Sequence, residues 1–233
     1  MEKLKALIFD VDGTMVDSER YGHLPACNDA MAQIGLDIQW DWDYFKKLIF
    51  AIPGSRNRLK SELGKREFSE GRIEGLLCEF EPLKKKIYIE KYLPKLKVRR
   101  GVRQMLNQAI ENNVRLAIVS TSYKSQIKAL IKAQFPEYEA KFEFILGKES
   151  GKKTFNNGFL HKKCLDLMKL NAKDVIMIED SSEGKQAALE ANISTAVFYN
   201  DYTKDEDFSQ ASLVAKSLKE YSIYDLEKIC LTK

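Results

Sequence analysis

The 233-residue sequence is long enough for one large domain or two modest ones with a real core. Its 44% hydrophobic and 31% charged residues are ordinary for a soluble globular protein, and a net charge of +4 is too balanced to indicate nucleic-acid binding. No apolar stretch has the length of a membrane span, and the first residues lack a secretory pattern. We therefore expect a cytoplasmic protein without nucleic-acid or membrane partners.

The histidines and cysteines exclude several kinds of enzyme. The chain has four scattered cysteines without a C-x-x-C pair, which we expect to be reduced core thiols. It has only two histidines, His23 and His161, and neither lies near a nucleophile-elbow pattern. A hydrolase built on a Ser-His or Cys-His pair and a multi-histidine zinc site are therefore disfavoured.

The first predicted strand ends in two acidic residues. Residues 4–9 form an apolar run broken only by Lys5, which is typical of a short buried strand. Asp10 and Asp12 follow, and because side chains alternate along a strand they can point the same way. Two close carboxylates need a cation, a shared proton or different functions. The plainer alternative is a strand that ends in an ordinary acidic turn.

A helical segment follows this strand. From about residue 21 to residue 92 the apolar residues recur at helical spacing, with breaks at Gly35, Pro53-Gly54 and Gly64. This pattern predicts an insertion of four or five short helices, and Pro94 marks its end. We expect residues 1–17 and 96–233 to form a core domain and residues 18–95 a separate helical domain.

From Gly101 onward, predicted helices and strands alternate. The predicted helices are 102–112, 125–134, 159–169, 183–191 and 224–230, and the predicted strands are 114–119, 142–146, 175–178, 194–199 and 213–215. Such alternation is typical of an α/β fold, a Rossmann-like parallel sheet with helices on both faces.

Three of the predicted strands end in polar residues that together describe a site. Parallel sheets place their active sites at the carboxyl ends of the strands, where three polar strand ends would meet: Asp10 and Asp12, Ser120 to Ser122, and Glu179-Asp180. A carboxylate can attack phosphorus and form an aspartyl-phosphate, which predicts Asp10 as nucleophile. Asp12 is then available as general acid and base.

An anionic nucleophile and an anionic substrate need a divalent cation between them, and Mg²⁺ suits carboxylate ligands. Asp10 and Asp180 are the predicted ligands, and Glu179 either ligates directly or holds a metal-bound water. Ser120 or Thr121 is expected to bind the phosphate. A lysine is expected to do so as well, and Lys153 is our choice for it.

Four short motifs in this sequence resemble those of a known superfamily of enzymes. Asp10 to Thr14, the Ser120 strand end, a lysine, and Glu179-Asp180-Ser181 with Gly184 resemble the four motifs of the haloacid dehalogenase superfamily, in its order and spacing. The helical insertion resembles the superfamily's C1-type α-helical cap. The resemblance implies a Mg²⁺-dependent phosphatase that works through an aspartyl-phosphate, with the backbone carbonyl of Asp12 as a further metal ligand.

Within the superfamily, the chain resembles the branch of β-phosphoglucomutase and CbbY. The resemblance is carried by Asp17-Ser18-Glu19 with His23 and Asn28, by Pro53-Gly54-Ser55-Arg56, by Gly35-Leu36-Asp37 with Trp40, Asp41 and Tyr44, and by the stretch 198–208. CbbY-type sugar-bisphosphate phosphatases are most similar. The resemblance implies a small phosphosugar substrate such as xylulose 1,5-bisphosphate, contacted from the cap by Glu19, His23 and Arg56. We expect a monomer.

The third motif departs from the family pattern. The usual Lys-Pro-x-Pro-Asp reads Lys153-Thr154-Phe155-Asn156-Asn157, so the lysine assignment rests on its spacing to the helix near Phe159 and Lys152 stays an alternative. Three other functions are alternatives: a phosphosugar mutase on the same site, a catalytically dead binding module, and a nucleotide-binding P-loop protein. The segment 147–154 misses the P-loop pattern, with three residues between its glycines and Lys153 before Thr154.

Overall fold

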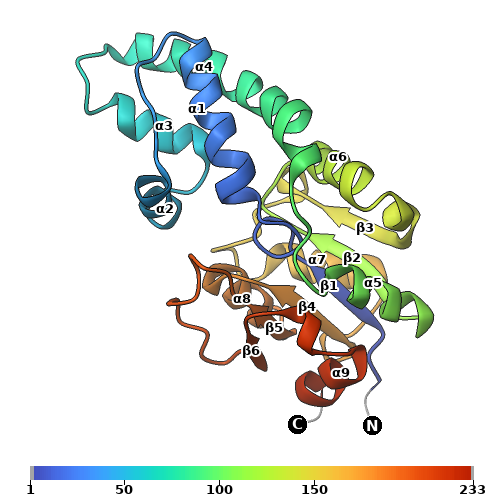
Figure 1. Cartoon of the computed structure of the whole chain (residues 1–233). Helices are drawn as coiled ribbons and strands as arrows, with labels where there is room; N and C mark the ends of the chain where they lie inside the picture. The colour runs from blue at the N-terminus through green and yellow to red at the C-terminus, as the bar shows by residue number, and fades with distance from the viewer. Residues whose placement is uncertain (1–2, 232–233) are drawn as a thin grey trace. The chain divides into compact units, whose positions relative to one another are not determined.

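The computed structural model describes residues 3–231. This part of the chain divides into two compact units (Figure 1). The sheet unit comprises the chain up to Asp17 and from Lys97 onward, and the helical unit comprises Ser18–Leu96. Among the described residues, no helix has the length and apolar character that a membrane crossing requires.

The sheet unit is built on one parallel sheet. Within residues 3–231 the sheet has six strands in the order β3-β2-β1-β4-β5-β6. The strands are β1 (Ala6–Phe9), β2 (Arg115–Val119), β3 (Phe142–Leu146), β4 (Val175–Glu179), β5 (Ser194–Phe198) and β6 (Leu213–Ala215). Every neighbouring pair is parallel, so the carboxyl ends of the strands lie at one edge. The predicted α/β fold is confirmed.

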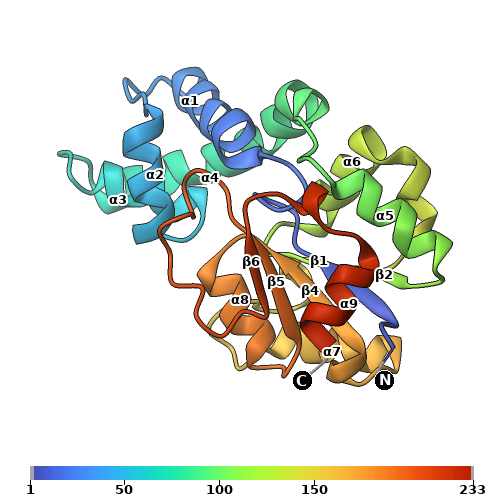
Figure 2. The ribbon, with the colours of Figure 1, turned by 60° about the horizontal axis from the view of Figure 1, so that its bottom comes forward.

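Helices cover both faces of this sheet (Figure 2). They are α5 (Val102–Glu111), α6 (Lys124–Gln134), α7 (Phe159–Met168), α8 (Ser182–Leu189) and α9 (Ile223–Leu231). Helices α7 and α8 pack on the face to which β1 contributes Ala6 and Ile8. Because side chains alternate along a strand, Leu7 and Phe9 lie on the opposite face, and all four are fully buried. A strand buried on both faces explains the continuous apolar run in the sequence.

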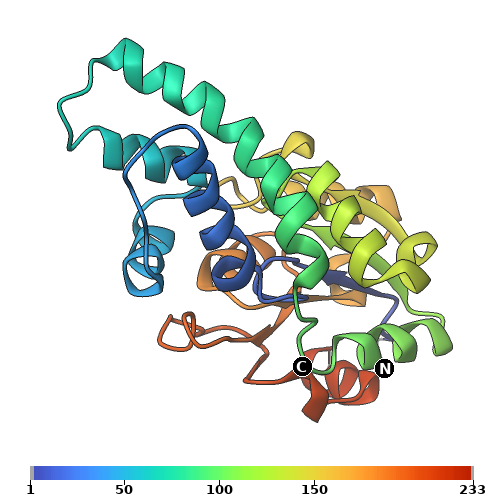
Figure 3. The same cartoon turned by 45° about the horizontal axis from the view of Figure 1, so that its top comes forward.

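The helical unit contains α1 (Leu24–Gln33), α2 (Trp42–Ala51), α3 (Ser55–Leu63) and α4 (Glu70–Ile87), with π-helical turns at Glu19–His23 and Tyr88–Tyr92 and a 3₁₀ turn at Leu93–Lys95. Helix α4 is the long helix beside α1 in Figure 3. It continues through Pro82, which cannot donate a backbone hydrogen bond. Its buried side chains, among them Leu77 and Phe80, keep the helix in place.

The two segments that join the units run side by side in the sheet unit. Val16 forms an antiparallel bridge with Val98. The backbone N–H of Arg99 donates to the carbonyl of Met15 at 2.9 Å. The segment that leaves the end of β1 and the segment that returns to the sheet are therefore hydrogen bonded to each other.

Candidate active site

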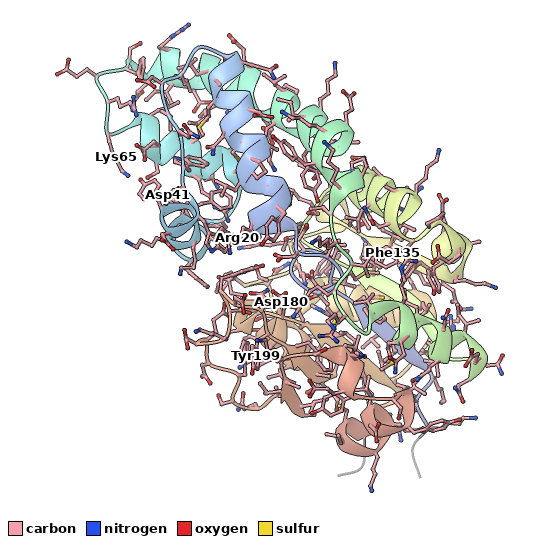
Figure 4. The ribbon with its side chains drawn as sticks, in the orientation of Figure 1. Arg20, Asp41, Lys65, Phe135, Asp180 and Tyr199 are labelled. Carbon is pink, nitrogen blue, oxygen red and sulfur yellow. The ribbon has the colours of Figure 1, made fainter. Side chains whose placement is uncertain are left out.

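Three buried carboxylates meet at the ends of β1 and β4. The register pairs Phe9 with Ile178, so Asp10 lies beside Glu179 and Asp180 at the carboxyl edge. One oxygen from each carboxylate lies within 4.8 Å of the others. Asp180 is labelled in Figure 4. The two acidic strand ends that the sequence predicted to meet are thus brought together.

Lys153 joins two of these carboxylates. Its Nζ donates to Asp10 Oδ1 at 2.6 Å and to Glu179 Oε1 at 2.5 Å, and its side chain is buried. Lys152 is exposed, with its ammonium group over the Phe155 ring. Of the two candidate lysines, Lys153 is therefore the one that contacts the buried carboxylates.

Burial and mutual repulsion shift the protonation of this cluster. Burial raises the pKa of Asp10 above its ordinary value, the Glu179 carboxylate adds to the shift, and Lys153 opposes it. Burial also raises the pKa of Asp180, again with contributions from Glu179 and Asp10. Burial alone would lower the pKa of Lys153, but Asp10 and Glu179 raise it above its usual range. The ammonium group does not balance the nearby carboxylates, and oxygen ligands with excess negative charge fit a hard divalent cation.

Asp12 is held by a residue that the sequence did not single out. Ser122 Oγ donates to Asp12 Oδ2 at 2.5 Å. Ser120 is buried, and its Oγ accepts from the N–H of Ser122 at 3.2 Å, whereas Thr121 is exposed. This turn brings the Ser122 hydroxyl to Asp12. In the sequence, Ser122 was marked only by its position among the polar residues that follow β2.

Asp180 accepts hydrogen bonds at both carboxylate oxygens. Thr14 Oγ1 donates to Oδ1 at 2.9 Å, and Asn200 Nδ2 donates to Oδ2 at 2.7 Å. Gly13 has a φ of +87°, and a Cβ there would lie 2.3 Å from Asp180 Oδ2. Only glycine allows this close approach. Asn200 was missed because it lies twenty residues after Asp180, beyond β5.

Glu179 is hydrogen bonded at both oxygens as well. Its Oε1 accepts from Lys153, and its Oε2 accepts from the backbone N–H groups of Asp180 and Ser181 at 3.0 and 3.3 Å. A Cβ on Gly184 would lie 1.9 Å from Oε1, so glycine is required here too. These contacts hold Glu179 in one orientation.

The predicted substrate residues of the helical unit divide into two groups. Glu19 is mostly buried, 3.8 Å from Arg58, and among the described residues its Oε2 has no hydrogen-bond partner. His23 is buried, with its Nδ1 2.8 Å from Lys84 Nζ and its ring stacked on Tyr88.

Arg56 forms ion pairs with acidic residues of α4. It pairs with Glu74 at 2.7 Å and with Glu81 at 3.5 Å. The nearby Arg58 is the arginine that approaches Glu19, and it also donates to the carbonyl of Ile52 at 2.8 Å. Both arginines lie in α3, and residues two apart project about 200° from each other around a helix. The sequence pattern did not distinguish them.

The segment that resembled a P-loop does not form one. After β3 comes a 3₁₀ turn, Lys148–Ser150, and the next helix begins only at Phe159. A phosphate-binding P-loop leads directly from strand to helix, and its lysine points to the phosphates. Here Lys153 contacts Asp10 and Glu179 instead.

Comparisons with known proteins show the family of the chain. A family model described as haloacid dehalogenase-like hydrolase matches residues 7–198. The chain is 31% identical to Protein CbbY, plasmid, of Cupriavidus necator over 222 residues, which cover 92% of this chain and 86% of that protein. It is 30% identical to a CBBY-like protein of Arabidopsis thaliana over 224 residues, 90% of this chain and 67% of that protein.

Solved structures share the fold. CbbY from Rhodobacter sphaeroides, crystallised with phosphate and, as a mutant, with xylulose-(1,5)bisphosphate, has a TM-score of 0.82 at 22% identity and covers 96% of this chain and 99% of its own. Beta-phosphoglucomutase from Clostridium difficile has a TM-score of 0.72 at 20% identity, with 97% and 96% covered. The chain therefore belongs to the haloacid dehalogenase-like hydrolases, in the CbbY-like branch, and is a phosphatase of that family.

Proposed function

We propose that the chain is a Mg²⁺-dependent phosphatase that acts on a small phosphosugar through an aspartyl-phosphate on Asp10. The observation that carries the proposal is the position of Asp10, buried at the end of β1 beside Glu179, Asp180 and Lys153. The chemistry of the substrate is proposed from similarity, because the related CbbY from Rhodobacter sphaeroides was crystallised with xylulose-(1,5)bisphosphate.

The residues proposed to hold Mg²⁺ are Asp10, Asp180 and the backbone carbonyl of Asp12. Glu179 is better suited to an outer role, because its Oε1 accepts from the Lys153 ammonium group and its Oε2 accepts from two backbone N–H groups. The Asp180 oxygens accept from the neutral side chains of Thr14 and Asn200, which leave the charge of the carboxylate to a cation. When bound, Mg²⁺ offsets the charge of the carboxylates and acts as a Lewis acid toward the phosphate oxygens.

Asp10 and Asp12 divide the reaction between them. Asp10 attacks phosphorus while Asp12 protonates the ester oxygen of the departing sugar. Asp12 then takes a proton from the water that hydrolyses the aspartyl-phosphate, which releases phosphate and restores Asp10. Ser122 orients the Asp12 carboxylate for both proton transfers. Lys153 binds Asp10 Oδ1, so the other oxygen is the one available to react, and the ammonium group stabilises charge on the phosphate.

Recognition of the rest of the substrate is proposed for the helical unit, acting as a cap. It buries two cationic side chains, Arg58 and Lys84, beside His23 and Glu19. Cations suit a second phosphate, and the Glu19 carboxylate suits a sugar hydroxyl. We propose Glu19 and His23 as substrate contacts, with Arg58 taking the role that the sequence assigned to Arg56.

A phosphate-release assay over a panel of phosphosugars tests the proposal. With Mg²⁺ present, xylulose 1,5-bisphosphate should release phosphate, and both chelation of the metal and the substitution Asp10→Asn should abolish this release. If β-glucose 1-phosphate with a trace of its bisphosphate gave glucose 6-phosphate instead of free phosphate, the enzyme would be a mutase. Normal turnover by the Asp10→Asn variant would exclude Asp10 as the nucleophile.

A further inference from the structure

We propose that Asn200, on the loop after β5, is a positioning residue for the metal site. Its side-chain amide holds the Asp180 carboxylate in the orientation that binds the cation. This inference rests on the proposed function, since it assumes that Asp180 is a ligand of Mg²⁺.

Asn200 and Thr14 hold Asp180 from two different loops. Asn200 Nδ2 lies 2.7 Å from Oδ2, and Thr14 Oγ1 lies 2.9 Å from Oδ1. Two donors on different oxygens fix the plane of the carboxylate. Both donors are neutral, so the negative charge stays available to a cation, and each oxygen keeps a further lone pair. Asp10 differs, because the ammonium group of Lys153 already neutralises part of its charge.

The orientation of the Asn200 amide follows from its other contacts. Its Oδ1 accepts from the backbone N–H groups of Tyr202 and Thr203, both at 3.1 Å. Because the carbonyl oxygen is used by these N–H groups, the NH₂ group is the end that faces Asp180. An aspartate at position 200 could keep the turn but could not donate to Asp180.

The loop that carries Asn200 is itself fastened to the catalytic loop. The Arg99 guanidinium donates to the carbonyls of Phe198 and Tyr199 at 2.7 and 2.8 Å, and also to the carbonyl of Gly13. One arginine therefore ties the end of β5 to the residue that follows Asp12. Tyr199 is labelled beside the sheet edge in Figure 4. Asn200 thus has a backbone position fixed relative to Asp180.

A carboxylate in this cluster needs such support. Asp180 lies beside Glu179 and Asp10, and repulsion among the three favours rotation of any carboxylate that is not held. Hydrogen-bond partners behind metal ligands typically contribute 10–100-fold to metal affinity. We expect Asn200 to contribute in this range.

The test measures binding of Mg²⁺ alone to the full chain by isothermal titration calorimetry, without substrate. Asn200→Ala should raise the Kd for Mg²⁺ by about 10–100-fold. Asn200→Ser is the second variant, because its hydroxyl can still accept the N–H groups of the turn but is too short to reach Asp180. It should show the same loss if the contact with Asp180 is responsible.

Thr203→Val is the matched control. It removes the hydroxyl that contacts Asn200 at 3.0 and 3.2 Å but leaves the amide beside Asp180. This variant should bind Mg²⁺ like the wild type, and an equal loss of affinity would assign the effect to the loop and overturn the inference. Wild-type affinity in Asn200→Ala and Asn200→Ser would also overturn it.

The outcomes separate this inference from the proposed function. If the wild type bound Mg²⁺ and the Asn200 variants bound it more weakly, the inference would be supported even if no phosphosugar released phosphate. If all bound equally well and the wild type were an active phosphatase, only the inference would fail. If the wild type bound no Mg²⁺, both would fail.

Discussion

The two units of this chain both bury charged side chains, but they satisfy them differently. In the sheet unit, Lys153, Glu179 and Asp180 have hydrogen bonds of 3.0 Å or less from several elements. In the helical unit, the buried pair of Glu19 and Arg58 is separated by 3.8 Å, and within the described residues Glu19 Oε2 accepts no hydrogen bond.

This difference corresponds to two kinds of site. A buried charge without full hydrogen bonding is costly, so it is retained where a ligand completes its contacts. The sheet unit holds its reactive groups in a fixed arrangement, which suits chemistry that is common to a family. In the helical unit, the Glu19 carboxylate is held less closely, which suits the substrate recognition proposed for that unit. The following variants test this contrast.

The largest effect is expected at Lys153. Lys153→Met leaves Asp10 and Glu179 buried without their shared cation, which typically costs about 3–5 kcal/mol of folding free energy. Urea unfolding measures this loss. Lys152→Met is the matched control, since Lys152 is exposed and should change stability by less than about 0.5 kcal/mol. Equal unfolding free energies for the two variants would contradict the assignment of Lys153.

A comparison of Arg58 with Arg56 tests the substrate recognition proposed for the helical unit. Arg58→Ala should raise KM for a sugar bisphosphate by about 10–100-fold, the range expected for losing hydrogen bonds to a charged group. Arg56→Ala should have little effect, because Arg56 pairs with Glu74 and Glu81 near the surface. Steady-state kinetics with a circular dichroism check of folding decide between them. A larger effect of Arg56→Ala would restore the assignment made from the sequence.

A smaller effect is expected when the hydrogen bond from Ser122 to Asp12 is removed. General acid–base catalysis contributes about 10²–10⁴-fold in total, and Ser122→Ala removes only one contact that orients the acid, so we expect kcat to fall by about 10-fold. Ser125→Ala, an exposed serine of the next helix, is the control. The pH dependence of kcat should change in Ser122→Ala only. An unchanged pH profile and rate would mean that Ser122 does not act on Asp12.

The smallest effect at neutral pH is expected at His161, for which the sequence pattern indicated no function. It is fully buried, burial lowers its pKa to about 3 with a contribution from Lys153, and neither ring nitrogen has a hydrogen-bond partner among the described residues. An unfolded histidine binds its proton near pH 6.5, so the unfolded state binds more protons between about pH 6.5 and 3. Stability should therefore fall as the pH falls through this window.

His161→Leu should remove this part of the acid sensitivity. Urea unfolding from pH 8 to pH 4 measures the free energy of unfolding of both proteins. At pH 8 the two values should differ by about 1 kcal/mol or less. As the pH decreases, the wild type should lose more stability than the variant. A constant difference between the two proteins at every pH would show that His161 is not kept neutral by burial.

The sequence predicted the parts of the site that depend on local pattern. Apolar runs predicted β1 and β4, and the acidic residues directly after or at the end of these strands had to meet at one edge of a parallel sheet. Strands β3 and β6 have the predicted bounds, and the other four strands differ from the prediction by one or two residues at one end.

The remaining site residues depend on geometry that no local pattern carries. Ser122 contacts Asp12 through the turn after β2, in which the Ser122 N–H donates to Ser120 Oγ and the Ser122 hydroxyl donates to Asp12. Arg58 replaces Arg56 near Glu19 because rotation around α3 separates them. Asn200 reaches Asp180 only through the neighbouring position of β4 and β5 in the sheet.

Acid quenching during turnover tests the central claim most directly. The protein is mixed with Mg²⁺ and a sugar bisphosphate that carries labelled phosphorus, the reaction is stopped within the first turnovers, and the labelled peptide is identified by mass spectrometry. The account predicts the label on Asp10 of the wild type and no label in Asp10→Asn. Rapid phosphate release by the wild type with the label on another residue would contradict it.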